Sequence, residues 1–283
     1  MIVRPFLVHA LSPLHAGIGQ AADIIDLPTA RLKATGIPIV PGSSLKGVLR
    51  DARRNEDEGR LEAVFGPPTR RAGEHAGALS LSDARLLAMP VRSFRGVFAW
   101  TTSPLLLSLA KRDLGERGRE LPVPAIDGRR ALVTTGSSVL HGAHVYLDEI
   151  QLEAKPSQEA TSWARFLAPL VSPGDDILSK RFVIVDDDTM AFFMETGTQV
   201  DAHVRLNPET RTVDQGALWL QESLPPETVL IALLTADRSR TNGKAAPLSP
   251  EAVAELGLPG EEIVQIGGKA TTGHGRCRLI PIN

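Results

Sequence analysis

The sequence has a single cysteine, Cys277, so no disulfide can form within the chain, and this cysteine usage fits a reducing compartment. It has no Cys/His zinc pattern, no GxxxxGK(S/T) nucleotide loop and no Rossmann glycine spacing. No run of about 18 apolar residues occurs, so we expect no membrane-spanning helix. Residues 1–13 are too short and unsuitable in composition for a signal peptide. These absences predict a cytoplasmic protein that does not bind a membrane.

The charge is nearly balanced overall but unevenly distributed. With 31 cations and 33 acids the net charge is −2, which by itself does not suggest nucleic-acid binding. However, residues 31–54 hold six cations and one acid, a local charge of +5, and residues 267–283 add +3. The other 242 residues therefore carry −10. Such a split suits one anion-binding groove among acidic surfaces, although chance clustering on solvated faces is an open alternative.

Residues 12–54 contain a long loop, a short extended run and a basic helix. A loop as long as 12–28 is uncommon in a compact domain unless it binds or catalyses. Ser43 or Ser44 is the expected N-cap of the helix, and Leu45, Val48, Leu49 and Ala52 then form one apolar face. Free backbone N–H groups at the helix start, beside serines and cations, make a good phosphate site.

Asp26 is the candidate catalytic residue of the long loop. Its neighbours Ile25 and Leu27 are apolar, so a carboxylate at this position requires an explanation. It is either a catalytic group or an acid that stabilises the loop structure. Asp23 lies in more polar company and could cap or bend the loop. His15 belongs to the same loop, where a hydrogen-bonded structural histidine is an equally open reading.

Residues 267–275, GGKATTGHG, are the second strong signal. Glycines allow a backbone to approach a phosphate chain closely, and successive N–H groups form an anion nest. The alternative is an ordinary glycine-rich hairpin. If the segment binds a phosphate chain, the expected contacts are Gly267, Gly268, Lys269, Thr272 and Gly273.

Strand and helix patterns mix without a strict βαβ rhythm, which predicts an α+β fold with an antiparallel sheet that carries helices on one face. Ser103 and Pro104 predict a capped helix start. Asp186–Asp188 could bind a metal, but a helix N-terminus is favoured there. Strands are expected over residues 2–10, 78–87, 93–100, 131–134, 144–152, 182–185, 229–234, 263–266 and 276–282, and a hairpin over 196–206 and 211–220.

Several stretches resemble one known family in the same order along nearly the whole chain. They are HALSPLHAGIGQ (9–20), IIDLPTAR (24–31), TGIPIVPGSSLKGVLR (35–50), FGPP (65–68), residues 78–104, DQGALWLQESLPP (214–226) and IGGKATTGHGRCRL (266–279). The family is the RAMP superfamily of CRISPR proteins. Within it, the chain is most similar to the repeated backbone subunit of the type III-B (Cmr) RNA-guided effector complex.

The resemblance implies a single RAMP domain over residues 1–283. Its core is a modified ferredoxin-like (RRM-like) palm, with inserted fingers at about 55–180 and a β-hairpin thumb at about 195–220. The implied function is binding of guide RNA (crRNA) and metal-dependent cleavage of complementary single-stranded target RNA at regular intervals. The implied partners are further copies of the chain, head to tail, and the other Cmr subunits.

The resemblance also assigns roles to residues. The aspartate of a DxP element cuts the target RNA, and Asp26-Leu27-Pro28 matches it, so Asp26 is expected to act as a base or to hold a divalent metal, with Mg²⁺ the expected ion. The counterpart of His15 lies near the scissile phosphate. Glu222 receives no role, because the neighbouring Leu220 departs from the aromatic or polar residue expected there. The expected grip on the guide backbone consists of Ser44, Lys46, Arg50 and the 267–275 segment.

Three alternatives stay open. The chain could be a non-catalytic RNA-binding scaffold of the same fold. It could be the equivalent subunit of the type III-A (Csm) complex. It could also be a metal-independent enzyme that matures the guide by histidine acid–base catalysis.

Overall fold

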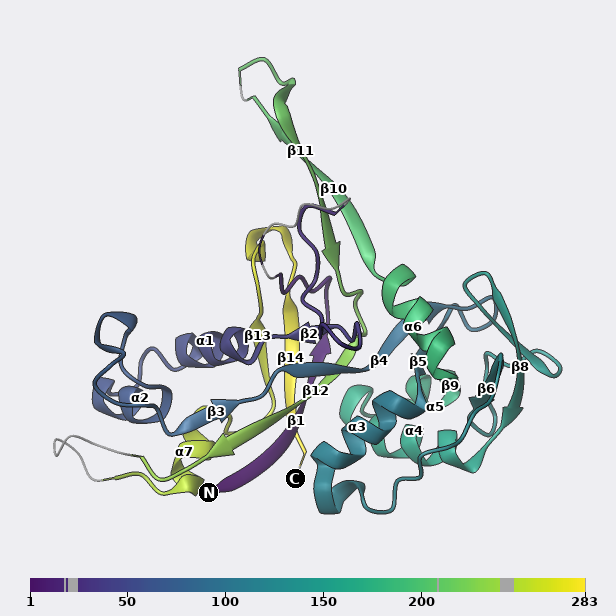
Figure 1. Ribbon diagram of the computed structural model, residues 1–283, viewed down its shortest axis with the longest axis horizontal. Helices are drawn as coiled ribbons and strands as arrows, with labels where there is room; N and C mark the ends of the chain where they lie inside the picture. Colours follow the sequence, from purple (N-terminus) through teal and green to yellow (C-terminus); the bar gives the residue numbers. More distant parts are fainter. Residues whose placement is uncertain (18, 20–24, 208, 240–246, 283) are drawn as a thin grey trace.

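One large sheet runs through the molecule in the computed structural model, which describes residues 1–17, 19, 25–207, 209–239 and 247–282 (Figure 1). Twelve strands form it, in the order β13-β14-β1-β12-β4-β5-β9-β6-β8-β7, with β2 added on β4 and β3 on β12. All pairings are antiparallel except β5–β9 and β6–β8. The predicted α+β class with a mainly antiparallel sheet is therefore confirmed.

The central part of the sheet is built on β1 (Ile2–Ala10), which lies between β12 (Val229–Ala236) and β14 (Arg276–Pro281). The edge strand β13 (Glu262–Gln265) pairs with β14. Residues 5–10 of β1 are all buried, because successive side chains of a strand point to opposite faces and both faces are covered here. The N-terminal strand of the chain thus lies in the middle of the fold.

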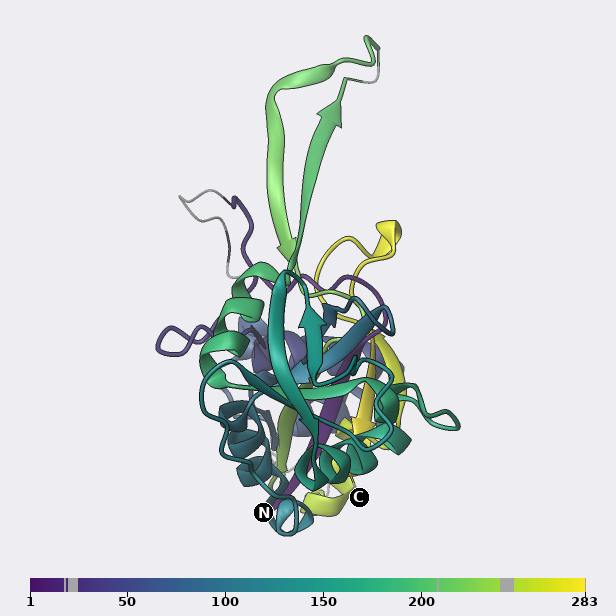
Figure 2. The same ribbon diagram turned by 90° about the vertical axis from the view of Figure 1, so that its right-hand side faces the viewer.

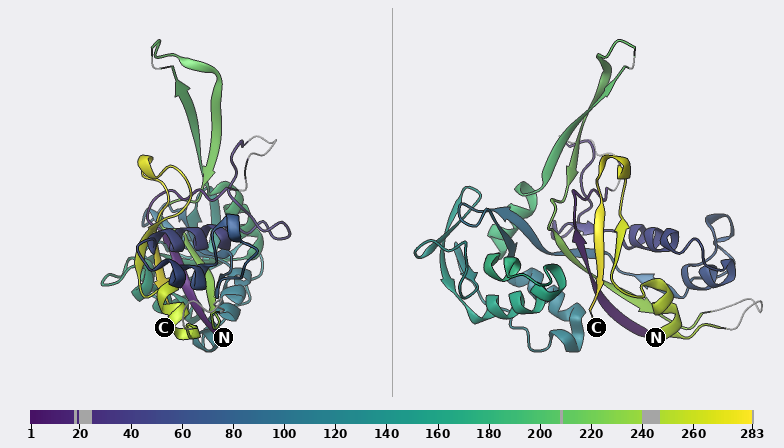
Figure 3. Two further views of the ribbon diagram at one scale, coloured as in Figure 1. Left: turned by 90° about the vertical axis from the view of Figure 1, so that its left-hand side faces the viewer. Right: turned by 180° about the vertical axis from the view of Figure 1, so that it is seen from behind.

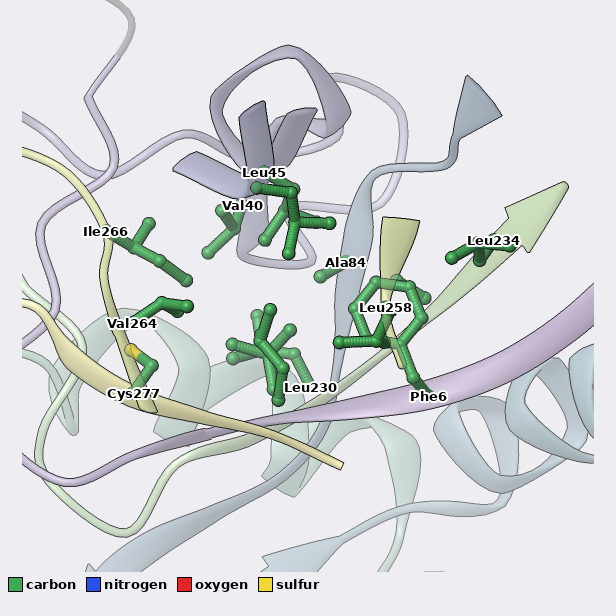
Figure 4. Close-up of a cluster of buried hydrophobic side chains, with 14 of the residues drawn as sticks. Phe6, Val40, Leu45, Ala84, Leu230, Leu234, Leu258, Val264, Ile266 and Cys277 are labelled. Atoms are coloured by element: carbon green, nitrogen blue, oxygen red, sulfur yellow. The ribbon is translucent and has the colours of Figure 1, made fainter. Parts of the chain in front are cut away.

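On one face of β1, Phe6 and Val8 pack into a core covered by three helices (Figure 4). These helices are α1 (Gly42–Ala52), α2 (Glu58–Phe65) and α7 (Pro250–Gly257). Leu45 and Leu49 of α1 are fully buried in this core, as the apolar spacing predicts. The strands β2 (Ile39–Val40) and β3 (Leu79–Leu81) belong to the sheet itself and contribute Val40 and Leu79 to this core, and the 3-10 turn η1 (Thr69–Arg71) lies between α2 and β3 in the chain.

On the opposite face, Leu7 packs into a second core with α3 (Pro104–Leu114) and α4 (Gln158–Val171). The prediction of helices on one face is therefore wrong, since helices cover both faces of β1.

The second half of the sheet continues through β4 (Ala84–Arg92), β5 (Phe98–Thr102), β9 (Phe182–Val185), β6 (Arg130–Val133), β8 (Ile150–Pro156) and β7 (His144–Leu147). The remaining helical pieces here are η2 (Gly115–Gly118), α5 (Ile177–Arg181) and α6 (Asp187–Thr196).

A separate two-stranded hairpin leaves the body of the protein (Figure 2). Its arms are β10 (Gln199–Leu206) and β11 (Val213–Ser223), so the hairpin predicted at 196–220 is confirmed, with a longer second arm. The arms pair antiparallel, with His203 opposite Trp219 and Val204 opposite Leu218.

Local capping chemistry explains several helix starts. Ser103 accepts a hydrogen bond from the Leu106 N–H and Pro104 begins α3, as predicted. Asp186 caps α6 by accepting from the Thr189 N–H, which confirms the helix-start interpretation of the acid triplet. Among the described residues no group of three or more His, Cys, Asp or Glu side chains could hold a metal.

The start of α1 differs from the prediction. The helix begins at Gly42 with Pro41 as N-cap, not at Ser43 or Ser44. The Gly42 N–H donates to Asp83 Oδ1 over 2.8 Å, and a Cβ at residue 42 would collide with the backbone of Leu81 and Ser82. Gly42 thus packs where the single strand expected over 78–87 is interrupted. That stretch is divided into β3 and β4 around Ser82 and Asp83.

A buried ion pair fastens α1 to the edge of the sheet. Arg53 donates from Nη1 and Nη2 to both carboxylate oxygens of Glu262, over 2.7 and 2.8 Å, and from Nε to the Leu256 carbonyl. Only 9% of the Arg53 side chain is exposed. No helix in the described part of the chain is both long and apolar enough to cross a membrane.

We predict that Arg53→Met lowers the free energy of unfolding by about 2–3 kcal/mol, because it leaves the Glu262 carboxylate partly buried without its cation. Urea denaturation of both proteins measures the effect. The matched control is Arg54→Met, since Arg54 is exposed and should change stability by no more than about 0.5 kcal/mol. Equal losses for the two variants would contradict the role given to Arg53.

Candidate active site and nucleic-acid interface

Three segments that are distant in the sequence meet at the base of the hairpin (Figures 1 and 3). They are the opening loop (residues 11–31, with 18 and 20–24 outside the described part), the hairpin root (219–224) and the glycine loop (266–275). Leu14 and Leu224 exchange two backbone hydrogen bonds, which join the opening loop to the hairpin root. The Gly275 N–H donates to the Pro13 carbonyl and joins the glycine loop to the opening loop. Asp23 lies among the residues that are not described.

Asp26 is half-buried at this junction. Its Oδ2 accepts a hydrogen bond from the Leu220 N–H over 2.8 Å. The adjacent Leu27 N–H donates to the Leu220 carbonyl, and the Glu222 N–H donates to the Leu27 carbonyl. The carboxylate is thus held at a fixed place beside β11. Within the described residues, Oδ1 has no hydrogen-bond partner and is available to another group.

His15 is held at the same junction through its ring. Its Nδ1 lies 2.6 Å from the Glu222 carbonyl oxygen, which can only accept, so Nδ1 carries the proton and Nε2 is the nitrogen left for other chemistry. The ring lies over Gly17, where a Cβ would come within 2.6 Å of Nε2. His15 and Asp26 are therefore both anchored on β11, on the backbone of Glu222 and of Leu220 respectively.

Glu222 is the residue whose importance the sequence did not reveal. It is 4% exposed, and its carboxylate accepts from the Thr29 N–H over 2.9 Å and from Arg31 Nη2 over 2.5 Å. Arg31 also donates to the Gly36 carbonyl. In the sequence, Arg31 is one of the cations of residues 31–54 and the last residue of the IIDLPTAR stretch, and no pattern indicates its partner. Its pairing with Glu222 fixes the end of the opening loop just after Asp26.

The cations predicted to grip phosphate make internal contacts. Lys46 Nζ donates to the Leu79 carbonyl over 2.9 Å, and burial, followed by the charge of Arg50, lowers the pKa of Lys46. Arg50 Nη1 donates to the Gly66 carbonyl over 2.6 Å. The carboxylate of Asp83 already lies at the start of α1. Ser44 remains half-exposed on the first turn. No hydrogen bond between described residues joins the Lys46 or Arg50 side chain to the three-segment junction.

The glycine loop has two kinds of glycine. Gly267, with φ +77°, presses on His15, so that a Cβ would collide with the His15 carbonyl oxygen. Gly268 and Gly273 have open space where a side chain would be. Between them lies η3 (Ala270–Thr272), flanked by left-handed backbone at Lys269 and Gly273, and Thr272 Oγ1 donates to the Lys269 carbonyl. The N–H groups of residues 272–275 donate to carbonyl groups of the protein, so within the described residues the N–H groups left for an anion are those of residues 267–271.

Comparisons with known proteins agree with one another. A family model described as the RAMP superfamily matches residues 7–278. The CRISPR system Cmr endoribonuclease Cmr4 of Pyrococcus furiosus is 34% identical over 289 residues, which cover 98% of this chain and 95% of that protein. The crystal structure of oligomeric Cmr4 from Pyrococcus furiosus is similar with a TM-score of 0.74, 25% identity and 99% of each chain covered.

A cryo-EM structure of the type III-B Cmr-beta complex bound to cognate target RNA contains a chain of the same fold. The TM-score is 0.76 at 20% identity, over 99% of this chain and 97% of that one.

We predict that Gly267→Ala lowers the free energy of unfolding by about 1–3 kcal/mol and displaces His15, because the added methyl group meets the His15 carbonyl in a backbone region that disfavours side chains. Thermal unfolding and the NMR signals of the His15 ring measure the two effects. Gly268→Ala is the matched control, since nothing lies near its Cβ. If both variants behave alike, Gly267 does not support His15.

We predict that Glu222→Ala costs about 3 kcal/mol of stability, because it leaves the half-buried Arg31 cation and the Thr29 N–H unpaired. Hydrogen exchange of the Thr29 amide should accelerate beyond the global change. Glu195→Ala, on an exposed position of α6, is the control. Unchanged protection at Thr29 would show that Glu222 does not hold the opening loop.

Proposed function

The chain belongs to the RAMP superfamily, and on this basis we propose that it is a backbone subunit of a type III-B (Cmr) CRISPR effector complex that binds guide RNA and complementary target RNA. One observation carries the proposal, namely 34% identity to a Cmr4 endoribonuclease along 98% of the chain. The meeting of the opening loop, which carries His15 and Asp26, with the hairpin root and the glycine loop supports it. Several copies would line up head to tail along one guide and associate with other Cmr subunits.

We further propose that the subunit cuts target RNA at Asp26. The ribose 2′-OH of the target is the nucleophile, and the in-line 5′ oxygen is the leaving group. Asp26 presents Oδ1 while Oδ2 is held by the Leu220 N–H, so the carboxylate can accept the 2′-OH proton without reorienting. With Nδ1–H held by the Glu222 carbonyl, His15 presents Nε2; as the imidazolium, which carries a second proton on Nε2, it can donate to a phosphate oxygen or give that proton to the leaving 5′ oxygen.

A divalent metal, Mg²⁺, is compatible with these residues. Mg²⁺ is commonly held by one or two carboxylates together with substrate phosphates and water, so Asp26 alone can supply the protein ligand. The ion would supply Lewis-acid stabilisation of the phosphate. RNA phosphate oxygens and water would complete the coordination of the ion.

The hairpin is suited to the role of a thumb on an RRM-like palm, with fingers at about 55–180. On one of its faces Val200, Val204 and Leu218 are exposed, the last at 63%. Cross-strand pairing places Val204 and Leu218 directly opposite each other. Such an apolar face can contact bases that have been unstacked from an A-form duplex, which would free the backbone to reach in-line geometry.

We propose that the guide backbone runs over the exposed glycine loop, with Gly267, Gly268, Lys269, Thr272 and Gly273 contributing, and past the start of α1 at Ser44. Lys46 and Arg50 would add positive potential from their internal positions. Sequence selection would come from guide–target pairing, because no base-reading side chains are required in such systems.

A second candidate is a non-catalytic scaffold with the same RNA-binding surfaces. It is favoured by the bond from the Leu220 N–H to Asp26, which gives this carboxylate a structural function independent of catalysis. The type III-A (Csm) backbone subunit would carry out the same reaction and is distinguished by its partner subunits.

We predict that Asp26→Asn abolishes target cleavage in the reconstituted complex while assembly and guide binding persist. The asparagine oxygen can still accept from the Leu220 N–H, so the loop keeps its place while the negative charge is lost. The rate should fall at least about 100-fold, the scale of a removed general base. Gel analysis of labelled target RNA measures it, with and without EDTA.

Asp237→Asn is the matched control, because Asp237 is exposed at the end of β12 beside the N-terminus. Undiminished cleavage by Asp26→Asn would leave the scaffold function as the explanation. Cleavage that is lost in EDTA and restored by Mg²⁺ would support the metal. Full activity in EDTA would exclude it.

A further inference from the structure

A cluster of polar side chains lies where the second face of the hairpin meets the glycine loop. Trp219 is at its centre. The His203 ring stacks on Trp219, with centroids 5.6 Å apart and an angle of 28° between the planes. Lys269 Nζ lies 5.8 Å from the centroid of the same indole. His274, from the end of the glycine loop, is close enough to affect the charge of His203.

Three nitrogens of this cluster are buried without a hydrogen-bond partner among the described residues. They are His203 Nε2, Lys269 Nζ and His274 Nδ1. Buried polar groups are nearly always paired in folded proteins, so the unpaired nitrogens of His203 and Lys269, both beside the Trp219 ring, are open to a ligand, as is His274 Nδ1 at the end of the glycine loop. Among the described residues, the acid that acts on His203 and Lys269 is Asp201, and its carboxylate already accepts from Gln199 Nε2 over 3.1 and 3.0 Å.

The charges of the cluster favour an anion. Burial lowers the pKa of Lys269, against the opposing effect of Asp201. Burial also lowers the pKa of His203 below its usual 6.5, with Lys269 and His274 acting in the same direction and Asp201 opposing them. Imidazole N–H groups and a lysine ammonium group are both donors for phosphate oxygens.

We propose that His203, Lys269 and His274 form a phosphate-binding site that takes one phosphodiester group of the guide RNA. The proposal rests on the proposed function and adds side-chain recognition to the backbone nest of the glycine loop. The open space beside Gly268 and Gly273 allows a polymer backbone, and not only a free ion, to approach. The site also joins the hairpin to the palm, so that a bound phosphate holds the two together.

The site should couple RNA binding to proton uptake. A phosphate beside His203 favours the protonated ring, so the pKa of His203 rises when RNA binds. In the free protein, burial together with Lys269 and His274 lowers the pKa of His203, so the difference between the bound and the free ring couples RNA binding to proton uptake. Affinity for RNA therefore increases as the pH falls through the pKa of the bound ring towards that of the free ring.

Trp219 provides a direct readout. Of the three tryptophans, Trp100 and Trp163 are buried at 2% and 0% exposure, while Trp219 is partly exposed. We expect the emission of the full-length chain to change when a short single-stranded RNA saturates it, and Trp219→Phe to remove this change. Inorganic phosphate at equal ionic strength should produce the change only at far higher concentration. Equal potency of phosphate and RNA would overturn the assignment to RNA.

Variants separate the roles of the three residues. Lys269→Met should weaken RNA binding about tenfold and lower the dependence of log K on log salt by about one unit. His203→Asn should flatten the pH dependence, and His274→Asn should weaken binding at all pH values. His75→Asn, between η1 and β3, is the matched control and should leave both properties unchanged.

Fluorescence anisotropy of labelled RNA distinguishes the possible failures. If the wild-type chain binds no RNA, the proposed function fails. If it binds RNA with unchanged Trp219 emission, or if His203→Asn keeps the full pH dependence, the phosphate site is wrong and the proposed function stands.

Discussion

The candidate site depends on backbone pairing between the opening loop and the hairpin root. Leu14 pairs with Leu224, and Leu27 bonds to Leu220 and Glu222, so the loop is held at two points along the same end of β11. Both candidate catalytic side chains are then fixed by backbone groups of that strand, Asp26 by an N–H and His15 by a carbonyl. The same strand carries the projecting hairpin. Any displacement of the hairpin root is therefore transmitted to Asp26 and His15 together.

The sheet makes this arrangement rigid. β1 leads into the opening loop, β12 follows the hairpin root, and β14 follows the glycine loop. Because β14, β1 and β12 are neighbours in the sheet, the three segments of the site start from adjacent strand ends. The cores on the two faces of β1 hold these strands in register. Ordering the opening loop costs conformational entropy. This cost is reduced because the strands of the sheet and the hairpin root fix the two ends of the loop.

Local features were predictable from the sequence, and contacts between distant segments were not. Ser103, Pro104 and Asp186 determine their helix starts through neighbours three residues away, so their signals are visible in the sequence. The Arg31–Glu222 pair spans 191 residues and has no periodic pattern. The start of α1 was misjudged because Gly42 packs on Leu81, a tertiary contact that overrides the serine capping signal. The meeting of Asp26, His15 and the glycine loop was expected only from the family resemblance.

The positive charge of residues 31–54 has a different meaning once its contacts are known. Four of its six cations bind protein groups, namely Arg31 with Glu222, Lys46 with Leu79, Arg50 with Gly66 and Arg53 with Glu262. Lys33 and Arg54 are exposed. Local charge in a sequence is therefore a poor measure of the charge available to RNA.

RNA binding by one subunit should accordingly use few free cations and more backbone donors, and neutral backbone N–H groups do not displace the counterions condensed on the RNA. Each subunit then contributes a modest salt dependence, and tight binding requires that several subunits act along one RNA. A chain with a net charge of −2 can therefore bind RNA when several copies line up along one guide. Each copy makes a weak contact, and the contacts together give an affinity that a single copy does not reach.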